Sequence, residues 1–265
     1  MGNCVPSLRL AGLAALLVLP WTAFAQLEAT PAVAPYEARY SIYRNGKLTG
    51  KMEVELSYRG DRWKIQSAGS GTYGLARILG ARDNEEASGR LADGRFRPER
   101  YRRHTLVAGL DDNWTFGFDW DARKVSITHN KHDALVLDIV GESLDPLSLK
   151  LEMRQRMATG NPDLQFHMVE EDEIDEQHFR LLPEERMETS LGCFRTLPVE
   201  KIRHNSTRYT RAWHAPELGF VEVRMAHGKT DGDHLEMRIT ELTLGGVEVA
   251  PRHGCAALQK ESGGS

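Results

Sequence analysis

Cysteine is scarce in this sequence, and the few cysteines follow no metal-binding spacing. Of the three cysteines among 265 residues, Cys4 lies near the start, whereas Cys193 and Cys255 lie far along the chain. No C-x-x-C pair occurs, and the ten histidines include no H-E-x-x-H motif, so the spacings typical of zinc ligands are absent. The sequence therefore predicts no bound metal ion, and no motif in it indicates a cofactor.

An excess of positive charge is also missing. The chain has 34 Lys and Arg residues against 38 Asp and Glu residues, which gives a net charge of −4. A nucleic-acid-binding protein is expected to carry a basic patch or a basic overall balance. This composition therefore excludes nucleic acid as the expected partner.

Long hydrophobic runs are confined to the first 25 residues. Arg9 precedes an apolar run, 10–19 (LAGLAALLVL), and Ala23-Phe24-Ala25 follows it. A basic start, a short apolar core and an A-x-A end are typical of a secretory signal peptide. A permanent membrane helix needs about 20 apolar residues, so this core is too short, and no later segment approaches that length. We expect residues 1–25 to be removed by cleavage after Ala25, which predicts a soluble periplasmic protein without a transmembrane anchor.

No catalytic motif is present either. A G-x-S-x-G nucleophile elbow is absent, and the similar run 67–71 (SAGSG) lacks the helix that would position its serine. Cys193 and His204 are close in sequence, which says little about a catalytic pair. We therefore predict a protein that is not an enzyme.

What remains is a strong β pattern from residue 36 onward. Residues 26–35 are rich in Ala, Pro and Thr and are expected to form a flexible lead-in. After them, apolar residues alternate with polar ones in short segments that are separated by turn residues such as Asn45-Gly46, Arg59-Gly60-Asp61 and Asp93-Gly94. The pattern predicts a mainly β protein with a single domain over 36–250 and a flexible tail over 251–265. Its expected architecture is a large curved antiparallel sheet or open barrel.

One helix is predicted in the middle of the chain. Ser143 or Asp145 can cap it, Pro146 suits its first turn, and the run Gly160-Asn161-Pro162 should end it. Leu147, Leu151, Arg154 and Ala158 share one face of this helix. We expect the helix to pack into the mouth or the concave face of the sheet.

Aromatic residues gather in one predicted strand, where Trp114, Phe116, Phe118 and Trp120 alternate. Alternation places all four rings on one face of a sheet. Such rings can fill a core, or they can line an apolar cavity if the sheet is too open to fill itself. The predicted apolar lining of a ligand site, with two further aromatics from the first strands, is Tyr40, Trp63, Trp114, Phe116, Phe118 and Trp120. The predicted polar rim for an anionic head group is Arg102, Arg103 and His104.

Two readings of the late cysteines stay open. An oxidising compartment would allow Cys193 and Cys255 to form a disulfide. Alternatively, Cys193 is a small buried residue and Cys255 is a free thiol in the glycine-rich tail.

Two stretches of the chain resemble the domain of unknown function 3108 family of bacterial exported proteins. The first is YEARYSIYRNGKLTGKMEVEL (36–56), and the second runs from DPLSLKLEMRQRMATG (145–160) to RAWHAPELGFVEVR (211–224). The chain departs from the family pattern at Leu218-Gly219-Phe220, where a Leu-Pro is expected. The resemblance implies an open barrel similar to that of the periplasmic lipoprotein-sorting factors, and it supplies no catalytic residues.

These observations lead to one preferred function and two alternatives. The preferred hypothesis is a non-enzymatic periplasmic protein that binds a lipid or another apolar small molecule, or an envelope protein, in the concave face of its sheet. The first alternative is a protein-protein interaction or assembly module of the cell envelope without a ligand cavity. The least favoured alternative is a metal-dependent hydrolase built on histidine and aspartate residues from separate strands.

Overall fold

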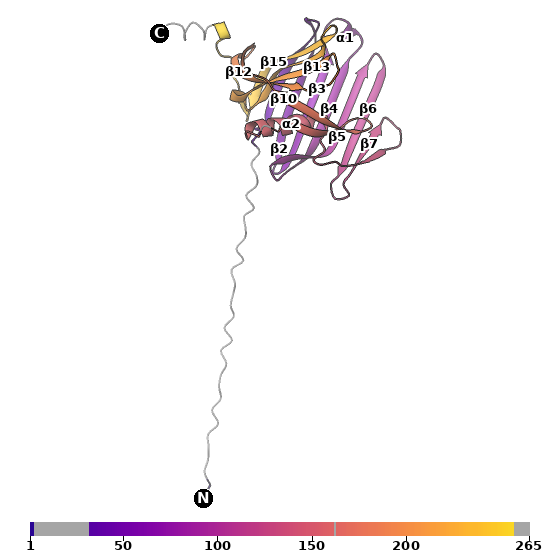
Figure 1. The fold of residues 1–265 in the computed structure, drawn as a ribbon, viewed down its shortest axis with the longest axis vertical. Coiled ribbons are helices and arrows are strands. Elements are labelled where there is room, and N and C mark those ends of the chain that lie inside the picture. The colour runs from indigo at the N-terminus through magenta and orange to yellow at the C-terminus, as the bar shows by residue number, and fades with distance from the viewer. Residues whose placement is uncertain (3–31, 162, 257–265) are drawn as a thin grey trace.

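One antiparallel network of 16 strands dominates the molecule (Figure 1). The computed structural model describes residues 1–2, 32–161 and 163–256. Apart from its first two residues, the predicted signal peptide lies outside these ranges, together with its cleavage site and residues 26–31 of the predicted lead-in. The strands, in chain order, are β1 (Tyr36–Arg44), β2 (Lys47–Arg59), β3 (Arg62–Gly71), β4 (Arg82–Ala92), β5 (Arg95–Val107), β6 (Leu110–Asp119), β7 (Lys124–His129), β8 (Leu135–Asp138), β9 (Gln165–Val169), β10 (Ile174–Leu181), β11 (Glu185–Thr189), β12 (Gly192–Lys201), β13 (Arg208–Ala215), β14 (Val221–Lys229), β15 (His234–Leu244) and β16 (Val247–Glu248). The helical segments are α1 (Gly74–Ile78), α2 (Pro146–Ala158) and the 3-10 turn η1 (Pro216–Leu218).

The first eight strands form a meander in which each strand pairs with the next. Asn45 and Gly46 connect β1 to β2 with φ values of 51° and 75°, the left-handed geometry of a tight hairpin turn. Gly60 connects β2 to β3, and Asp93-Gly94 connects β4 to β5, in the same left-handed region. The turns predicted at these three places are confirmed. The segment between β3 and β4, which the sequence left as a helical turn or a loop, forms the short helix α1.

The second half of the sheet joins the first through β1. That strand pairs with β2 on one side and with β15 on the other, so that Tyr36 faces both Leu56 and Leu244. From β15 the sheet continues through β14, β13, β12 and β10 to β9. In Figure 1 these later strands cross in front of the meander, and α2 lies near the crossing. Leu144 extends the structure past β9, because its backbone exchanges hydrogen bonds with His167 and Val169.

Helix α2 begins where the sequence predicts it. The Asp145 carboxylate accepts the amide hydrogens of Leu147 and Ser148 at 2.9 Å, and the Ser148 hydroxyl accepts the amide of Asp145, which completes a capping box. Pro146 occupies the first turn, where its missing N–H costs nothing. The helix ends at Ala158, before the predicted Gly160-Asn161-Pro162 stop.

Helix α2 is buried on several sides and not on one apolar face alone. Ten of its thirteen residues are buried, and they contact two separate apolar clusters. Leu147 and Leu151 join the cluster beneath the meander, whereas Leu149, Met153 and Met157 join a second cluster against β9 and β12. The helix therefore fills the space between the two halves of the sheet.

Buried polar side chains of α2 tie surrounding loops to it. Glu152 accepts the backbone amide of Phe96 at 3.1 Å, and Gln155 donates to the carbonyl of Gly94 at 3.0 Å. Arg156 pairs with Glu152 at 3.2 Å and donates to two carbonyls that follow the helix, one in the loop and one at the start of β9. Buried polar groups must be paired, and these bonds satisfy them while fixing the position of the helix.

Aromatic side chains fill one end of the fold. The ring of Trp63 meets that of Phe96 edge-on at 5.6 Å between centroids, and both side chains are almost fully buried. Tyr101, farther along β5, packs against Phe116 of β6 at 4.9 Å between centroids. These residues close the end of the fold at which β3 and β5 begin.

Among the residues that the structure describes, no helix has both the length and the apolar character needed to cross a bilayer.

Candidate ligand-binding hollow

A hollow of about 260 Å³ lies between the sheet and α2. It borders the inner faces of β1 to β4 on one side and of β14 and β15 on the other, with Pro146, Leu147 and Lys150 of α2 beneath. Most of its surface is apolar, and three flexible methionines contribute to it. The apolar side chains that border it include Ile42, Met52, Val54, Met225, Leu235 and Met237.

A larger depression, of about 460 Å³, lies on the outer face of β1, β2 and β15. Its walls carry Glu37, Glu53, Glu55 and Glu241. A surface with so many carboxylates offers no apolar burial to a ligand. The hollow beside α2 is therefore the better candidate for a small-molecule site.

Lys150 is the basic residue that borders this hollow. It keeps 46% of its side-chain surface accessible on a helix whose neighbouring residues are buried. The Nζ atom lies 4.0 Å from Oε2 of Glu222, whose other oxygen is buried without a hydrogen-bond partner. The Glu222 carboxylate raises the pKa of Lys150 despite the opposing effect of burial. The hollow thus holds a stable positive charge beside an incompletely satisfied carboxylate.

Two more carboxylates border the hollow. Burial raises the pKa of Glu85, which accepts a hydrogen bond from the hydroxyl of Tyr101 at 2.8 Å. Asp83 accepts from Thr105 at 2.5 Å and from Arg103 at 3.4 Å. Glu85 therefore holds its proton more strongly than an exposed glutamate, and Asp83 is balanced by a neighbouring cation.

The residues of the predicted polar rim lie on opposite faces of β5. Arg103 points to the inner face, where it contacts Asp83, because it shares that face with Tyr101. Arg102 and His104 alternate onto the outer face, and His104 pairs there with Asp111 at 2.9 Å. Consecutive residues of a strand point to opposite sides, so the three cannot form one rim.

Of the predicted aromatic lining, Tyr40 borders the hollow. Trp63 belongs to the filled end of the fold, Phe116 packs on Tyr101, and Trp114 stacks on His129 at 4.0 Å between centroids. Phe118 stacks with Trp120 at 6.0 Å, and the Trp120 indole donates to the carbonyl of Pro98 at 2.6 Å.

These five rings pack against their own neighbours, so they contribute core rather than a cavity wall. Trp120 also follows the end of β6 at Asp119, which places it in the turn instead of the predicted stripe.

The sequence reading missed the residues that do border the hollow beside Tyr40. Met225 and Met237 face each other across β14 and β15, in strands that had been recognised. Lys150 gave a clearer signal, since it is a charged residue within the otherwise buried run 147–153 (LSLKLEM). A lysine in a helix that is buried on several sides must reach solvent or a cavity.

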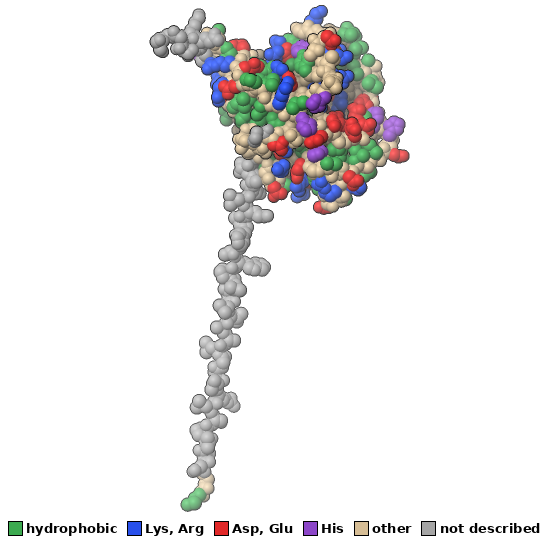
Figure 2. Space-filling model, viewed as in Figure 1, with side chains coloured by type: hydrophobic (Ala, Val, Ile, Leu, Met, Phe, Trp, Pro, Cys, Tyr) green, Lys and Arg blue, Asp and Glu red, His purple; other side chains and the backbone are tan. Residues whose placement is uncertain are grey.

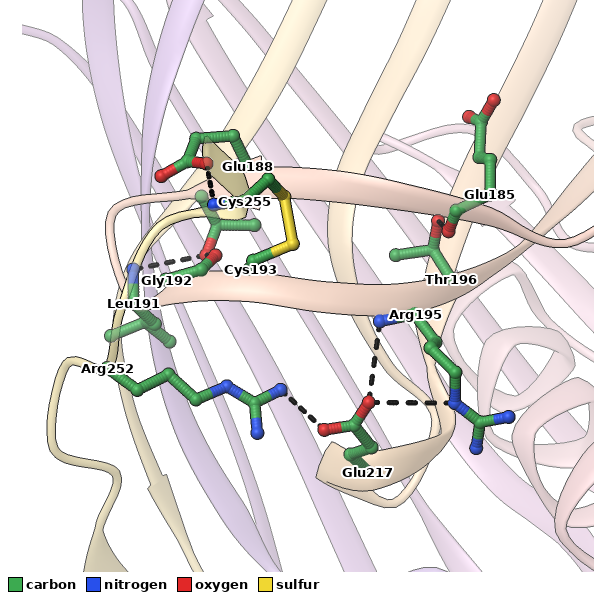
Figure 3. The surroundings of a disulfide bond; sticks show 11 residues. Glu185, Glu188, Leu191, Gly192, Cys193, Arg195, Thr196, Glu217, Arg252 and Cys255 are labelled. Carbon is green, nitrogen blue, oxygen red and sulfur yellow. Dashed lines mark hydrogen bonds and ion pairs between the residues drawn. A yellow bond between two sulfur atoms is a disulfide. The ribbon is translucent and has the colours of Figure 1, made fainter. Parts of the chain in front are cut away.

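Cys193 of β12 forms a disulfide with Cys255 near the C-terminus (Figure 3). Backbone hydrogen bonds hold the same segment, from Arg252 to the carbonyl of Leu191 and from Cys193 to the carbonyl of His253. The amide of Cys255 donates to Glu188 at 2.6 Å. The first part of the predicted flexible tail is therefore fastened to β12, and the part from residue 257 onward lies outside the described residues.

The histidines and carboxylates do not form a metal-binding cluster in the described part of the chain. Between residue 32 and residue 256, leaving out the undescribed position 162, no group of three metal-ligating side chains converges. His129 instead pairs with Asp112 at 2.6 Å, and Trp114 donates to the same carboxylate at 3.1 Å.

Solved structures with the same fold include a β-barrel-like protein of domain of unknown function DUF1849 from Brucella abortus. It has a TM-score of 0.54 and 10% sequence identity, and the match covers 80% of this chain and 98% of that one. A protein assigned as a lipoprotein from Parabacteroides distasonis has 10% identity and a TM-score of 0.34, with 80% of this chain and 97% of that one covered. A protein assigned as an exported protein with a YmcC-like fold from Bacteroides fragilis has 11% identity and a TM-score of 0.32, with the same coverage.

The first of these structures shows the fold alone, which is mainly β with one open antiparallel sheet and one main helix. Among curated proteins, none matches the sequence. A family model matches residues 35–240, which span most of the chain and include both stretches that carried the resemblance. The chain therefore belongs to the family described as protein of unknown function DUF3108.

Proposed function

We propose that this protein is a non-enzymatic periplasmic binding protein that takes up an apolar or lipid-like ligand in the hollow between its sheet and α2. The observation that carries the proposal is the apolar hollow itself, which borders the cationic side chain of Lys150. A hollow of this composition matches an amphiphile, whose apolar part is buried and whose polar end meets Lys150 and Glu222.

The size and the lining of the hollow narrow the ligand class. Typical small-molecule pockets measure roughly 300–1,000 Å³, and this hollow lies just below that range at about 260 Å³. A single acyl chain or a small apolar compound suits it better than a lipid with two chains. Met52, Met225 and Met237 can change rotamer at low cost, which would let the hollow adapt to a guest.

The disulfide supports the proposed location. Disulfides persist in oxidising compartments outside the cytoplasm and are rare inside it. Cys193 and Cys255 form one here, which agrees with an extracytoplasmic protein. The proposed signal peptide accounts for how the chain would arrive there.

The proposal is tested by measuring the uptake of a fluorescent fatty acid by protein purified from the periplasm of an expression host. Wild-type protein is expected to bind the probe, and native mass spectrometry is expected to detect a co-purified small molecule. The variant Met225→Trp places a bulky ring in the hollow, so its affinity for the probe should fall at least tenfold. The matched control Ser126→Trp adds the same ring on an exposed position of β7 and should bind as wild type does.

Two results would oppose the proposal. One is an apo mass together with no probe uptake by the wild-type protein. The other is equal uptake by wild type and by Met225→Trp, because a ligand in the hollow must compete with that ring.

A second candidate function follows from the free edge of the sheet. Strand β8 ends the sheet order, and its Leu135 and Val136 are exposed. An apolar edge strand can accept a strand from a partner protein. This assembly module would be favoured if crosslinking in the cell envelope captured a protein at β8 while the hollow bound no probe.

A further inference from the structure

The segment around α1 exposes large apolar side chains at one end of the sheet. Leu75 and Ile78 are 68% and 79% exposed, and Tyr73 and Leu79 beside them are also exposed. Leu110, at the start of β6, adds a further exposed side chain at 61%. Figure 2 shows hydrophobic side chains gathered at the upper right of the molecule, in the area where Figure 1 places α1 and the upper end of β6. We call Tyr73, Leu75, Ile78, Leu79 and Leu110 the apolar tip.

Backbone hydrogen bonds hold the tip in place. Gly71 donates to the carbonyl of Ala81 at 2.8 Å, and Ala81 donates to that of Ala76 at 3.0 Å, which closes the loop at its base. Thr72 donates to Thr49 of β2 at 3.0 Å, and the amide of Ala108 donates to the carbonyl of Leu79 at 2.9 Å.

The loop is therefore fastened to β2 and to the turn between β5 and β6. The exposed side chains therefore project from a backbone that hydrogen bonds hold in place.

Gly71 shows how closely this loop packs. A Cβ atom added there would lie 2.6 Å from the carbonyl oxygen of Ala76. The backbone of α1 thus presses against the end of β3 with its small residue, and its large residues face outward. Exposed side chains of this size on a fixed surface indicate a partner that removes them from water.

The segment around α1 is positively charged, unlike the chain as a whole. Residues 72–82 contain Arg77 and Arg82 and no acidic residue, whereas the whole chain has a net charge of −4. Within the described residues, neither Arg77 nor Arg82 forms an ion pair. The tip therefore combines apolar side chains and one tyrosine with two unpaired cations.

We propose that the apolar tip docks onto a lipid bilayer whose surface contains anionic lipids. Leucine, isoleucine and tyrosine side chains would enter the boundary between head groups and acyl chains, and Arg77 and Arg82 would meet the anionic head groups. The charge of the tip favours a lipid surface as the occupant, because residues 72–82 contain two arginines and no acidic residue.

The apolar tip is adjacent in sequence to a residue that borders the hollow. Arg82 directly precedes Asp83, which borders the hollow beside α2. A molecule bound through the tip would hold that end of the sheet against the membrane. Docking through the apolar tip does not depend on whether the hollow binds a ligand.

The test is flotation of the exported form with vesicles of phosphatidylethanolamine and phosphatidylglycerol at 3:1, and with phosphatidylcholine vesicles as the neutral arm. Wild-type protein is expected to float with the anionic vesicles, and the fraction bound should fall as salt is raised. The variant Leu75→Ser/Ile78→Ser should lose at least tenfold in partitioning. Arg77→Gln/Arg82→Gln should lose binding to the anionic vesicles and lose its salt dependence.

The matched control is Leu135→Ser/Val136→Ser, which removes two exposed apolar side chains from β8 and should float as wild type does. All substituted side chains are exposed, and thermal melts will show whether the variants fold. The proposal is overturned if wild-type protein stays unbound, or if Leu75→Ser/Ile78→Ser floats equally well. It is also overturned if sedimentation shows a wild-type dimer that the same variant converts to a monomer without any effect of lipid.

Discussion

At Gly89, the backbone of β4 passes so close to its neighbours that no side chain fits. A Cβ atom there would lie 2.1 Å from the carbonyl oxygen of Arg97 and 2.7 Å from the indole of Trp63. The register of β4 against β5 also shifts at this residue, beside Pro98. This shift forms a bulge, and Gly89 is the residue that lets Trp63 occupy the filled end of the fold.

We expect Gly89→Ala to lower the free energy of unfolding by about 1–3 kcal/mol, because the added methyl group forces the indole and the β5 backbone apart. Urea denaturation measures the change. Gly117→Ala in β6 is the control, since a Cβ there meets nothing within 4 Å and the stability should stay near wild type. Equal stability of the two variants would contradict the packing argument.

The sequence predicted which strand residues face inward, but it did not predict which of them border the hollow. Alternation placed Trp114, Phe116 and Phe118 on the inner face correctly. It could not separate Phe116, which fills the core, from Met225, which borders the hollow. That distinction depends on where α2 lies, and α2 is positioned by contacts such as the bond from Phe96 to Glu152 that join residues far apart in sequence.

At the scale of one element, α2 is a helix whose cap is also a buried acid. Burial raises the pKa of Asp145 from 3.8 to about 6, against the opposing effect of the hydrogen bonds that it accepts from Leu147 and Ser148. The folded protein therefore holds this proton more tightly than the unfolded chain does. The resulting stabilisation is complete below pH 3.8 and is lost as the pH rises through about 6.

We expect Asp145→Asn to remove this pH dependence while it preserves the cap, because asparagine accepts the same hydrogen bonds. Between pH 4 and pH 6.5 the unfolding free energy of wild type should fall by about 2 kcal/mol relative to that of the variant. Urea denaturation at several pH values checks this difference. If the two stability curves stay parallel over that range, then folding does not raise the pKa of Asp145. Asp121→Asn, in an exposed turn, should follow wild type.

The strands' turns and the start of α2 could be predicted because short-range sequence signals specify them. Turn residues such as Asn45-Gly46 and the helix cap at Asp145 act over a few residues, so the sequence reveals them directly. The burial of α2 on several sides was not foreseen. Its Glu152 looks like a surface residue in sequence, and a partner far along the chain, the backbone amide of Phe96, makes its burial favourable.

At the scale of the whole molecule, the disulfide fastens the C-terminal segment to β12. The sequence left the pairing of Cys193 and Cys255 open, since nothing local brings residues 62 positions apart together. The structure brings them within 4.8 Å between Cα atoms. Closing a loop of this length restricts the unfolded chain.

We expect Cys193→Ser/Cys255→Ser to lower the free energy of unfolding by about 2–4 kcal/mol. Dithiothreitol should lower the stability of wild type to that of the variant and leave the variant unchanged. Urea denaturation with and without the reductant makes the comparison. A wild-type protein that is indifferent to the reductant would show that the bond contributes nothing to the fold.

The pairing of β1 with β15 has a consequence for the order in which the chain assembles. A chain that emerges from its N-terminus can build the meander early, because each strand finds its partner in the next segment. The second partner of β1 arrives only with residues 234–244, late in synthesis. Until then β1 offers an open row of amide and carbonyl groups to any passing strand. A cell that makes this protein would benefit from a chaperone that shields that row until the last strands are delivered.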